Sequence, residues 1–436
     1  MIKNESLGLK FNQKPFKLRN FTFANHKNIN NPLKKRLFII FIFLNNYVSV
    51  FGQNIVSIAG KIINHDTQQP VSGVYIGIPA KGSNTSAIGV ISNDSGEFTL
   101  KYPILLQATG SFIITKINYK DVRKSLLEYK EKKDSLIFEV RPVEFKTVEA
   151  RDARKTMDYV LARLEKNYNP NPYSMTGFYR ESLYLDSVFV KVVEGVLRVE
   201  KYPFPDKGNL GEVSKLLKGR RYEKSEGKEA WEGLQFGNGV DLVTRTLETK
   251  LPDFLEKSNL KNYKYTIDSE LNECDGMPVF NITFSPLDKK LKAGKIGKIQ
   301  VDTLTMGILS YEFEFTSDGL KDVMGGGVFG GNKNSKVKNF KVFQTYHTAL
   351  NNYYLHESIL EIQAIIKEEN LESPAILTLN FSATEANTRM GVPIKDNEIL
   401  ENTDFPLGGK KYEDGFWGNF NFIKPSIRLI HLFPKN

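Results

Sequence analysis

Residues 53–145 alternate between short apolar runs and turn sequences, with a turn about every eight to twelve residues. Within one run, Phe98 and Leu100 alternate with Thr99 and Lys101, so one face of that strand points inward and the other outward. This spacing predicts a small β-sandwich.

The pattern changes near residue 150 to the period of a helix. Apolar side chains recur at intervals that place them on one helical face, namely Met157, Val160, Leu161, Leu164 and Tyr168. An Asn-Pro-Asn-Pro sequence follows and ends the helix, because a residue before proline avoids the helical conformation. We expect this linker helix to pack on a sheet.

Longer β-strands are predicted from Thr176 onward. Hairpin turns are expected at residues 186–187, 274–276, 304–306 and 350–352, where turn sequences separate runs of strand-forming residues. Residues 203–250 are rich in Gly, Lys and Glu without a clear period and are predicted to form a long loop with short helical pieces. Successive strands with short turns predict a curved antiparallel sheet.

The formal net charge of the 436-residue chain is +10, but it is concentrated in the first 52 residues. Nine Lys and Arg against one Glu give this segment +8, so the remaining chain carries +2. Such a weak net charge does not favour a nucleic-acid partner.

The same basic segment has the features of a secretory signal peptide. A positive stretch at 34–36 precedes an apolar run at 37–44, and the small residues Val50 and Gly52 suit cleavage before Gln53. The apolar stretch falls short of the roughly 20 residues of a comfortable membrane span. A cleaved leader and a retained anchor helix remain the two alternatives, and either predicts export.

Three segments of the sandwich region resemble the carboxypeptidase-regulatory-like domain. They are GKIIN at Gly60–Asn64, PVSGVYI at Pro70–Ile76 and SNDSGEFTL at Ser92–Leu100. This resemblance implies a seven-stranded transthyretin-like or immunoglobulin-like sandwich and says almost nothing about function.

The later strands resemble the half-barrel of the periplasmic lipoprotein carriers in their order over residues 260–385. The chain is also similar to a group of Gram-negative envelope proteins, through TGFYRE at Thr176–Glu181 and the aromatic sequence at Tyr412–Ile423. These resemblances imply a periplasmic or outer-membrane-associated protein, and a half-barrel implies a groove for a lipid or a lipoprotein chain.

The predicted fold class is therefore mainly β, with a seven-stranded sandwich, a linker helix and a curved, half-barrel-like antiparallel sheet. The predicted divisions are 1–52 (extension and signal peptide), 53–145 (sandwich), 146–172 (linker helix), 173–411 (antiparallel β domain) and 412–436 (aromatic C-terminal segment).

The sequence lacks the motifs of the common hydrolases and metalloenzymes. None of the five histidines has Glu three residues later, there is no Gly-x-Ser-x-Gly sequence, and Cys274 is the single cysteine. His347 and His356 can face each other across a hairpin, where a surface metal pair and a pair of solvent-facing strand residues are the alternatives. We expect no catalytic, cofactor-binding or metal-binding residues and no cofactor.

Two aromatic sets are candidates for binding. The first would line an acyl-binding groove or form ordinary core, and comprises Phe178, Tyr184, Phe189, Phe313, Phe315 and Phe343. The second would dock the C-terminal segment near the linker helix, and comprises Phe416, Trp417 and Phe420.

We therefore predict an exported, non-enzymatic envelope protein with a binding or assembly role, whose partner is an unidentified envelope protein or a lipid-like ligand. Lipid or lipoprotein binding in a half-barrel groove and a hydrolase with an unrecognised site are the alternatives. The sequence does not show whether the second sheet is closed or open.

Overall fold

The computed structural model describes most of the chain after residue 53. The predicted leader, its cleavage site and residues 431–436 of the C-terminal segment lie outside the described residues. Contacts divide the chain into Met1–Asn54 and Ile55–Asn436, and the fold below belongs to the second unit. The described residues are 54–79, 87–129, 136–143, 146–147, 152–186, 188–204, 211–224, 239–268, 270–274, 277–325, 335–349, 352–368, 371–387, 390–401, 405–407, 414–426 and 429.

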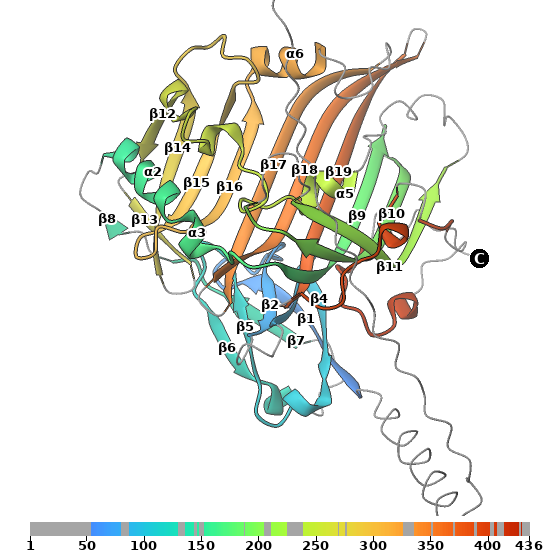
Figure 1. Cartoon of the computed structure of the whole chain (residues 1–436). Helices are drawn as coiled ribbons and strands as arrows, with labels where there is room; N and C mark the ends of the chain where they lie inside the picture. Colours follow the sequence, from blue (N-terminus) through green and yellow to red (C-terminus); the bar gives the residue numbers. More distant parts are fainter. Residues whose placement is uncertain are drawn as a thin grey trace, which may run out of the picture. The chain divides into compact units, whose positions relative to one another are not determined.

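Seven strands form the sandwich (Figure 1). One sheet has the order β4-β1-β7, with β1 and β7 parallel, and the other has the order β6-β5-β2-β3. The elements are β1 (Ile55–Asn64), β2 (Tyr75–Ile78), β3 (Ala87–Ile91), β4 (Glu97–Pro103), η1 (Ile104–Leu106), β5 (Ser111–Thr115), β6 (Val122–Ser125), η2 (Leu126–Tyr129) and β7 (Leu136–Val140).

The core of the sandwich follows the predicted alternation. In β4, Phe98, Leu100 and Tyr102 are buried, whereas the residues between them are exposed or half-buried. Their side chains meet Phe112 and Ile114 of the facing sheet in one apolar cluster. Burial of this cluster holds the two sheets together.

The larger sheet is antiparallel, as predicted for the fold class, and it is open, which the sequence alone did not show. Its order is β11-β10-β9-β19-β18-β17-β16-β15-β14, both β12 and β13 pair with β14, and β8 pairs with β13. The strands are β8 (Lys146–Thr147), β9 (Tyr173–Leu185), β10 (Val188–Lys201), β11 (Glu212–Glu223), β12 (Tyr263–Ile267), β13 (Glu270–Cys274), β14 (Met277–Pro286), β15 (Lys295–Asp302), β16 (Ile308–Phe315), β17 (Ser335–Ala349), β18 (Asn352–Glu368) and β19 (Leu371–Asn387).

The four predicted hairpins are confirmed, and the loop predicted over 203–250 is wrong in part. Strand β11 lies in that stretch and pairs along its whole length with β10. Its side chains are mostly half-buried and follow no two-residue alternation, because β11 is an edge strand. This explains why the apolar pattern did not reveal it.

Short helices cover one face of the large sheet, which we call the inner face. Helix α2 contacts β12 there, and its Met157 and Val160 belong to a large apolar cluster that extends along the face to Tyr179 and Leu183 of β9. The described helices and turns that follow the sandwich are α2 (Ala153–Ala162), α3 (Leu164–Asn167), α5 (Gly239–Thr244), η4 (Asp253–Leu255), η5 (Leu260–Asn262), α6 (Ser317–Gly325), η6 (Asp396–Glu398) and η7 (Asp414–Trp417), of which η7 lies on the opposite face. The chain's own side chains therefore fill the described part of the inner face.

The sandwich adjoins the large sheet through a short strand pairing. Residues Ala87 and Ile88 of β3 pair with Ala386 and Glu385 of β19, so the two sheets are continuous at this point. The connection brings the turns of the sandwich over the other face of the large sheet, which we call the outer face, and the candidate site lies there.

Candidate functional site

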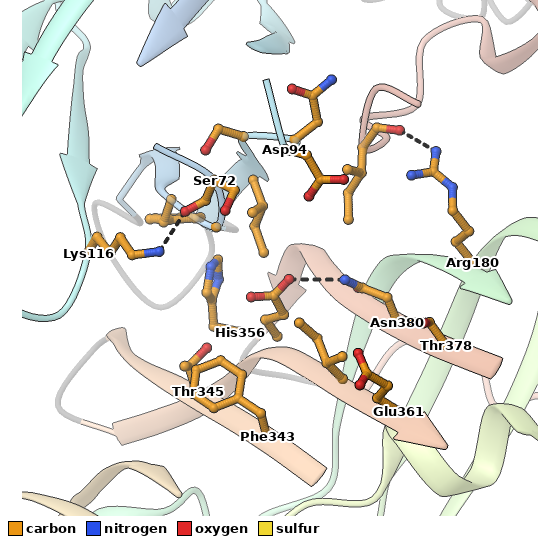
Figure 2. A pocket seen from close by; sticks show the side chains of 18 of the residues that line it. Ser72, Asp94, Lys116, Arg180, Phe343, Thr345, His356, Glu361, Thr378 and Asn380 are labelled. Atoms are coloured by element: carbon orange, nitrogen blue, oxygen red, sulfur yellow. Dashed lines mark hydrogen bonds between the residues drawn. The ribbon is translucent and has the colours of Figure 1, made fainter. Parts of the chain in front are cut away.

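A cavity of about 890 Å³ lies between the turns of the sandwich and the outer face of the large sheet (Figure 2). Strands β9, β17, β18 and β19 supply its floor. Part of its wall comes from the C-terminal segment, through Ile423, Lys424, Ser426 and Leu429. Its volume is within the range of pockets that hold small molecules. The sandwich side is formed by Ser72, Gly73 and Tyr75, by residues 91–94, and by residues 115–118.

The turn after β3 has a fixed backbone shape. The side-chain oxygen of Asn93 accepts hydrogen bonds from the backbone N–H groups of Ser95 and Glu97, at 3.0 and 2.8 Å. Gly96 has a positive φ of 75°, and a Cβ there would lie 2.3 Å from the carbonyl oxygen of Ile62. This turn presents the exposed Asp94 to the cavity.

Tyr75 lies flat on its own sheet at the sandwich side of the cavity. A Cβ at Gly77 or Gly89 would lie 2.1 or 2.0 Å from atoms of the Tyr75 side chain, so only glycine leaves room for this ring. The two glycines pair with each other across β2 and β3. The Tyr75 ring is therefore held against the two histidines of the large sheet.

His347 and His356 meet at this end of the cavity, with ring centroids 4.3 Å apart. The Tyr75 ring lies 4.8 Å from the first and 4.5 Å from the second. The two histidines are not paired in register, because His347 pairs with Tyr354. His356 is instead the extra residue of a β-bulge.

The bulge at His356 changes which side chains face the cavity. Tyr346 pairs with Leu355 and Thr345 pairs with Glu357, so His356 has no opposite residue. As a result His356 and Glu357, although consecutive, both line the cavity.

The prediction of solvent-facing histidines is wrong for His356. Its side chain is 7% exposed and its Nε2 has no hydrogen-bond partner. Burial, and then the neighbouring His347, hold the pKa of His356 well below its usual value, so the ring is neutral near pH 7. Among the described residues, no group of three His, Cys, Asp or Glu is placed to hold a metal ion.

Glu357 is a buried carboxylate that lines the cavity. Its Oε1 accepts a hydrogen bond from the Asn380 side-chain amide at 3.1 Å (Figure 2). Burial raises the pKa of Glu357, the Asn380 bond and the nearby Lys116 partly offset this, and Asp94 raises it further. The amide of Asn380 must point its nitrogen toward this carboxylate, and its Oδ1 then has no partner.

Lys116 approaches the same region from the sandwich. Its ammonium donates a 2.5 Å hydrogen bond to the carbonyl oxygen of Ser72 (Figure 2). Burial lowers the pKa of Lys116, and the charge of Glu357 partly offsets this. Positively and negatively charged groups therefore face the cavity, together with neutral hydrogen-bonding side chains.

A buried ion cluster adjoins the cavity beneath the C-terminal segment. Glu194 accepts hydrogen bonds from Arg180 at 2.8 Å and from Arg220 at 2.7 and 2.9 Å. Arg180 also donates to the carbonyl oxygen of Ile423 at 2.7 Å, which ties the C-terminal segment to β9 (Figure 2).

The adjacent Glu181 lies on the inner face and pairs with Lys191. Arg180 and Glu181 therefore have separate partners, since consecutive strand residues point to opposite faces.

The structure does not bring the six predicted groove aromatics into one groove. Phe313 and Phe315 pack against the inner-face core, whereas the other four lie on the outer face. Of these four, Phe178 packs under the C-terminal segment, and the remaining three line the cavity. Those three are Tyr184, Phe189 and Phe343.

The C-terminal aromatics dock on the β domain, but not at the predicted place. Trp417 is fully buried against Phe178 and Val196 of the outer face, with Phe416 and Phe420 packed beside it. The linker helix packs on the inner face. Docking near that helix is therefore corrected to docking on the opposite face of the sheet.

The sequence reasoning missed most polar residues of the cavity. Tyr75, Lys116, Thr378 and Asn380 occupy strand or turn positions that a two-residue alternation assigns to solvent. Gly77 and Gly89, which leave room for the Tyr75 ring, are twelve residues apart and form no recognisable motif in the sequence. Only the approach of the sandwich distinguishes these positions from an ordinary exposed face.

Comparisons with known proteins show similarity at a low level. No protein-family profile matches the chain, so the resemblance to the carboxypeptidase-regulatory-like domain has no support from this source, and no curated protein sequence matches it either. The LolA superfamily protein NE2245 from Nitrosomonas europaea aligns with 58% of this chain and 99% of its own, at 8% identity and a TM-score of 0.23. A DUF1329 family protein from Desulfovibrio piger aligns with 56% of this chain and 95% of its own, at 8% identity and a TM-score of 0.23.

A third structure is a membrane-associated protein of unknown function from Bacteroides fragilis. It aligns with 76% of this chain and 97% of its own, at 7% identity and a TM-score of 0.14. Within the part of the chain that the structure describes, no helix is long and apolar enough to span a membrane.

Proposed function

We propose that this chain is an exported, non-enzymatic binding protein of the cell envelope, at the periplasm or outer membrane, and that its ligand occupies the cavity between the sandwich and the large sheet. The observation that carries the proposal is the cavity itself. Its floor stands on paired strands, and the buried side chains of Glu357 and His356 line it together with the half-buried Asn380. Export and the absence of catalysis rest on the leader sequence and on the missing hydrolase motifs.

A preformed site on strands suits binding, because its side chains need little ordering when the ligand arrives. The hydrogen bond from Asn380 orients Glu357, and the packing of Tyr75 orients the two histidines. The buried acceptor Oδ1 of Asn380 has no hydrogen-bond partner in the protein. A buried acceptor without a partner lowers the stability of the fold. A donor group of a bound ligand would remove this loss after a small rotation of the Asn380 side chain.

A lipid-like ligand is the second candidate, and one observation favours it. Tyr184, Phe189, Ile376 and Leu429 give one end of the cavity an apolar lining. This second candidate places a lipid at that end of the cavity and not on the inner face, which the chain's own core fills over its described residues.

The test of the binding role is native mass spectrometry of the full chain recovered from an envelope extract. A retained mass increment is expected for the wild-type protein. Thr378→Trp places a large ring on the cavity floor and should abolish the increment, whereas Thr266→Trp on the exposed face of β12 should keep it. An intact, uncleaved chain in the cytosolic fraction would contradict the envelope location, and a wild-type chain that never carries a ligand would contradict the binding role.

A further inference from the structure

The strand register arranges the cavity floor in three rows of side chains. Each row crosses neighbouring strands, and rows two residues apart are separated by roughly 7 Å along the strands. The near row contains Phe343, Ile359, Asn380 and Arg180, the middle row contains Glu361, Thr378 and Ser182, and the far row contains Ile376 and Tyr184.

The middle row is polar from end to end. It presents a carboxylate and two hydroxyl groups, all on half-buried side chains. Gln363 donates a hydrogen bond to one oxygen of Glu361 at 2.8 Å, which holds that carboxylate in place. In Figure 2, Thr378 and Glu361 lie side by side on the floor, near Asn380.

The middle row divides the apolar surface of the cavity floor into two patches. Phe343 and Ile359 form one, and Ile376 with Tyr184 forms the other. An acyl chain that reached from one patch to the other would cover the middle row and remove water from its polar groups. Each buried polar group left without a partner costs about 1 to 3 kcal/mol, so the floor disfavours a long apolar chain.

A sugar ring has the complementary surface, because its C–H groups form flat apolar faces and its hydroxyl groups lie around the edge. The rings of Phe343 and Tyr184 can contact such faces, while Thr378, Ser182 and Glu361 meet the hydroxyl groups between them. The charges around the cavity are of both signs, which favours a neutral ligand. We infer that the cavity binds a neutral oligosaccharide, an inference that rests on the binding role proposed above.

The test uses the folded full chain, titrated in a calorimeter with chitotriose and with maltotriose. Binding of at least one trisaccharide is expected. Thr378→Val replaces the central hydroxyl by a methyl group of similar shape and should weaken binding roughly tenfold. The matched variant Thr266→Val lies on the exposed face of β12, outside the cavity, and should bind as the wild type does. Unchanged thermal unfolding of both variants shows that the fold is intact.

Binding of chitotriose alone would support an amino-sugar glycan, and binding of maltotriose alone a glucan. Equal affinities of the two valine variants would overturn the inference, because the sugar would then bind elsewhere. Decanoic acid is titrated in parallel. If it binds and neither sugar does, the saccharide inference fails while the proposed binding role stands. If the sugars, decanoic acid and the envelope extract all leave the chain unbound, the proposed function fails as well.

Discussion

The indole ring of Trp417 meets the ring of Phe178 edge to face, with centroids 5.1 Å apart and planes at 87°. Phe178 belongs to β9, the third strand from the β11 edge of the sheet, and Trp417 belongs to the C-terminal segment. Arg220 lies over the same indole at 5.2 Å, so the contact also covers part of the buried ion cluster around Glu194. The C-terminal segment is thus part of the packed β domain.

Trp417→Ala should destabilise the protein by about 3 to 4 kcal/mol, because it empties a fully buried site. Truncation after Lys411 should lower the melting temperature by several degrees for the same reason. The measurement is thermal unfolding followed by circular dichroism. Leu304→Ala is the control, since Leu304 is 72% exposed and its loss should change little. A truncated chain that melts with the wild type would show that this segment serves a partner and not the fold.

Gly77→Ala should displace the Tyr75 ring without unfolding the sandwich. The new Cβ would overlap the end of the Tyr75 side chain, which can rotate away, whereas the backbone cannot. We expect the ring resonances of His347 and His356 to shift in NMR spectra, because both rings contact Tyr75. Gly391→Ala, where the nearest atom is 3.5 Å away, should leave those resonances in place. Unshifted histidine signals in Gly77→Ala would contradict the described packing.

His356 should make the protein less stable as the pH falls below about 6.5. Its folded pKa is lowered, so the unfolded chain takes up a proton that the folded chain refuses. One such proton changes the unfolding free energy by about 1.4 kcal/mol per pH unit. Urea unfolding at pH 5, 6 and 7 should show a shallower pH dependence for His356→Gln than for the wild type. Parallel curves for the two proteins would disprove a neutral buried ring.

Glu357 should make the protein less stable as the pH rises. Its folded pKa is raised, so its contribution to stability is fully present below about pH 4.3 and is lost as the pH rises through the folded pKa. Glu357→Gln keeps an acceptor for Asn380 and never ionises. Its stability relative to the wild type should therefore increase from pH 4.5 to pH 7.5 in the same urea assay. A difference that stays constant across this range would show that the carboxylate titrates normally.

Glu194→Gln should cost about 3 to 5 kcal/mol, because it leaves the charges of Arg180 and Arg220 without their shared partner. Glu194 is 1% exposed, so water cannot replace the lost carboxylate. The control is Glu312→Gln, which breaks an exposed pair with Lys341 and should cost less than about 1 kcal/mol. If chemical denaturation shows that the two variants lose the same unfolding free energy, the buried cluster contributes no more to stability than a surface ion pair.

The sequence by itself determined the mainly β class, the turns and the inward-facing residues of most strands. These features are local, since side chains alternate with a period of two and turn residues act within four positions. The helix over α2 and α3 was readable for the same reason, as Met157, Val160, Leu164 and Tyr168 repeat on one face and all are buried.

Only the tertiary structure decided what covers the polar face of the large sheet. Glu357 and Asn380 have the sequence pattern of solvent-facing strand residues, yet the turns of the sandwich enclose them. These turns precede the two residues in the sequence by some 240 residues or more. The bulge at His356 adds a second departure, because one extra residue reverses the alternation that a pattern assumes. Contacts between distant segments leave no periodic trace, and therefore the cavity, the buried histidine and the place where Trp417 docks could be seen only once the chain was folded.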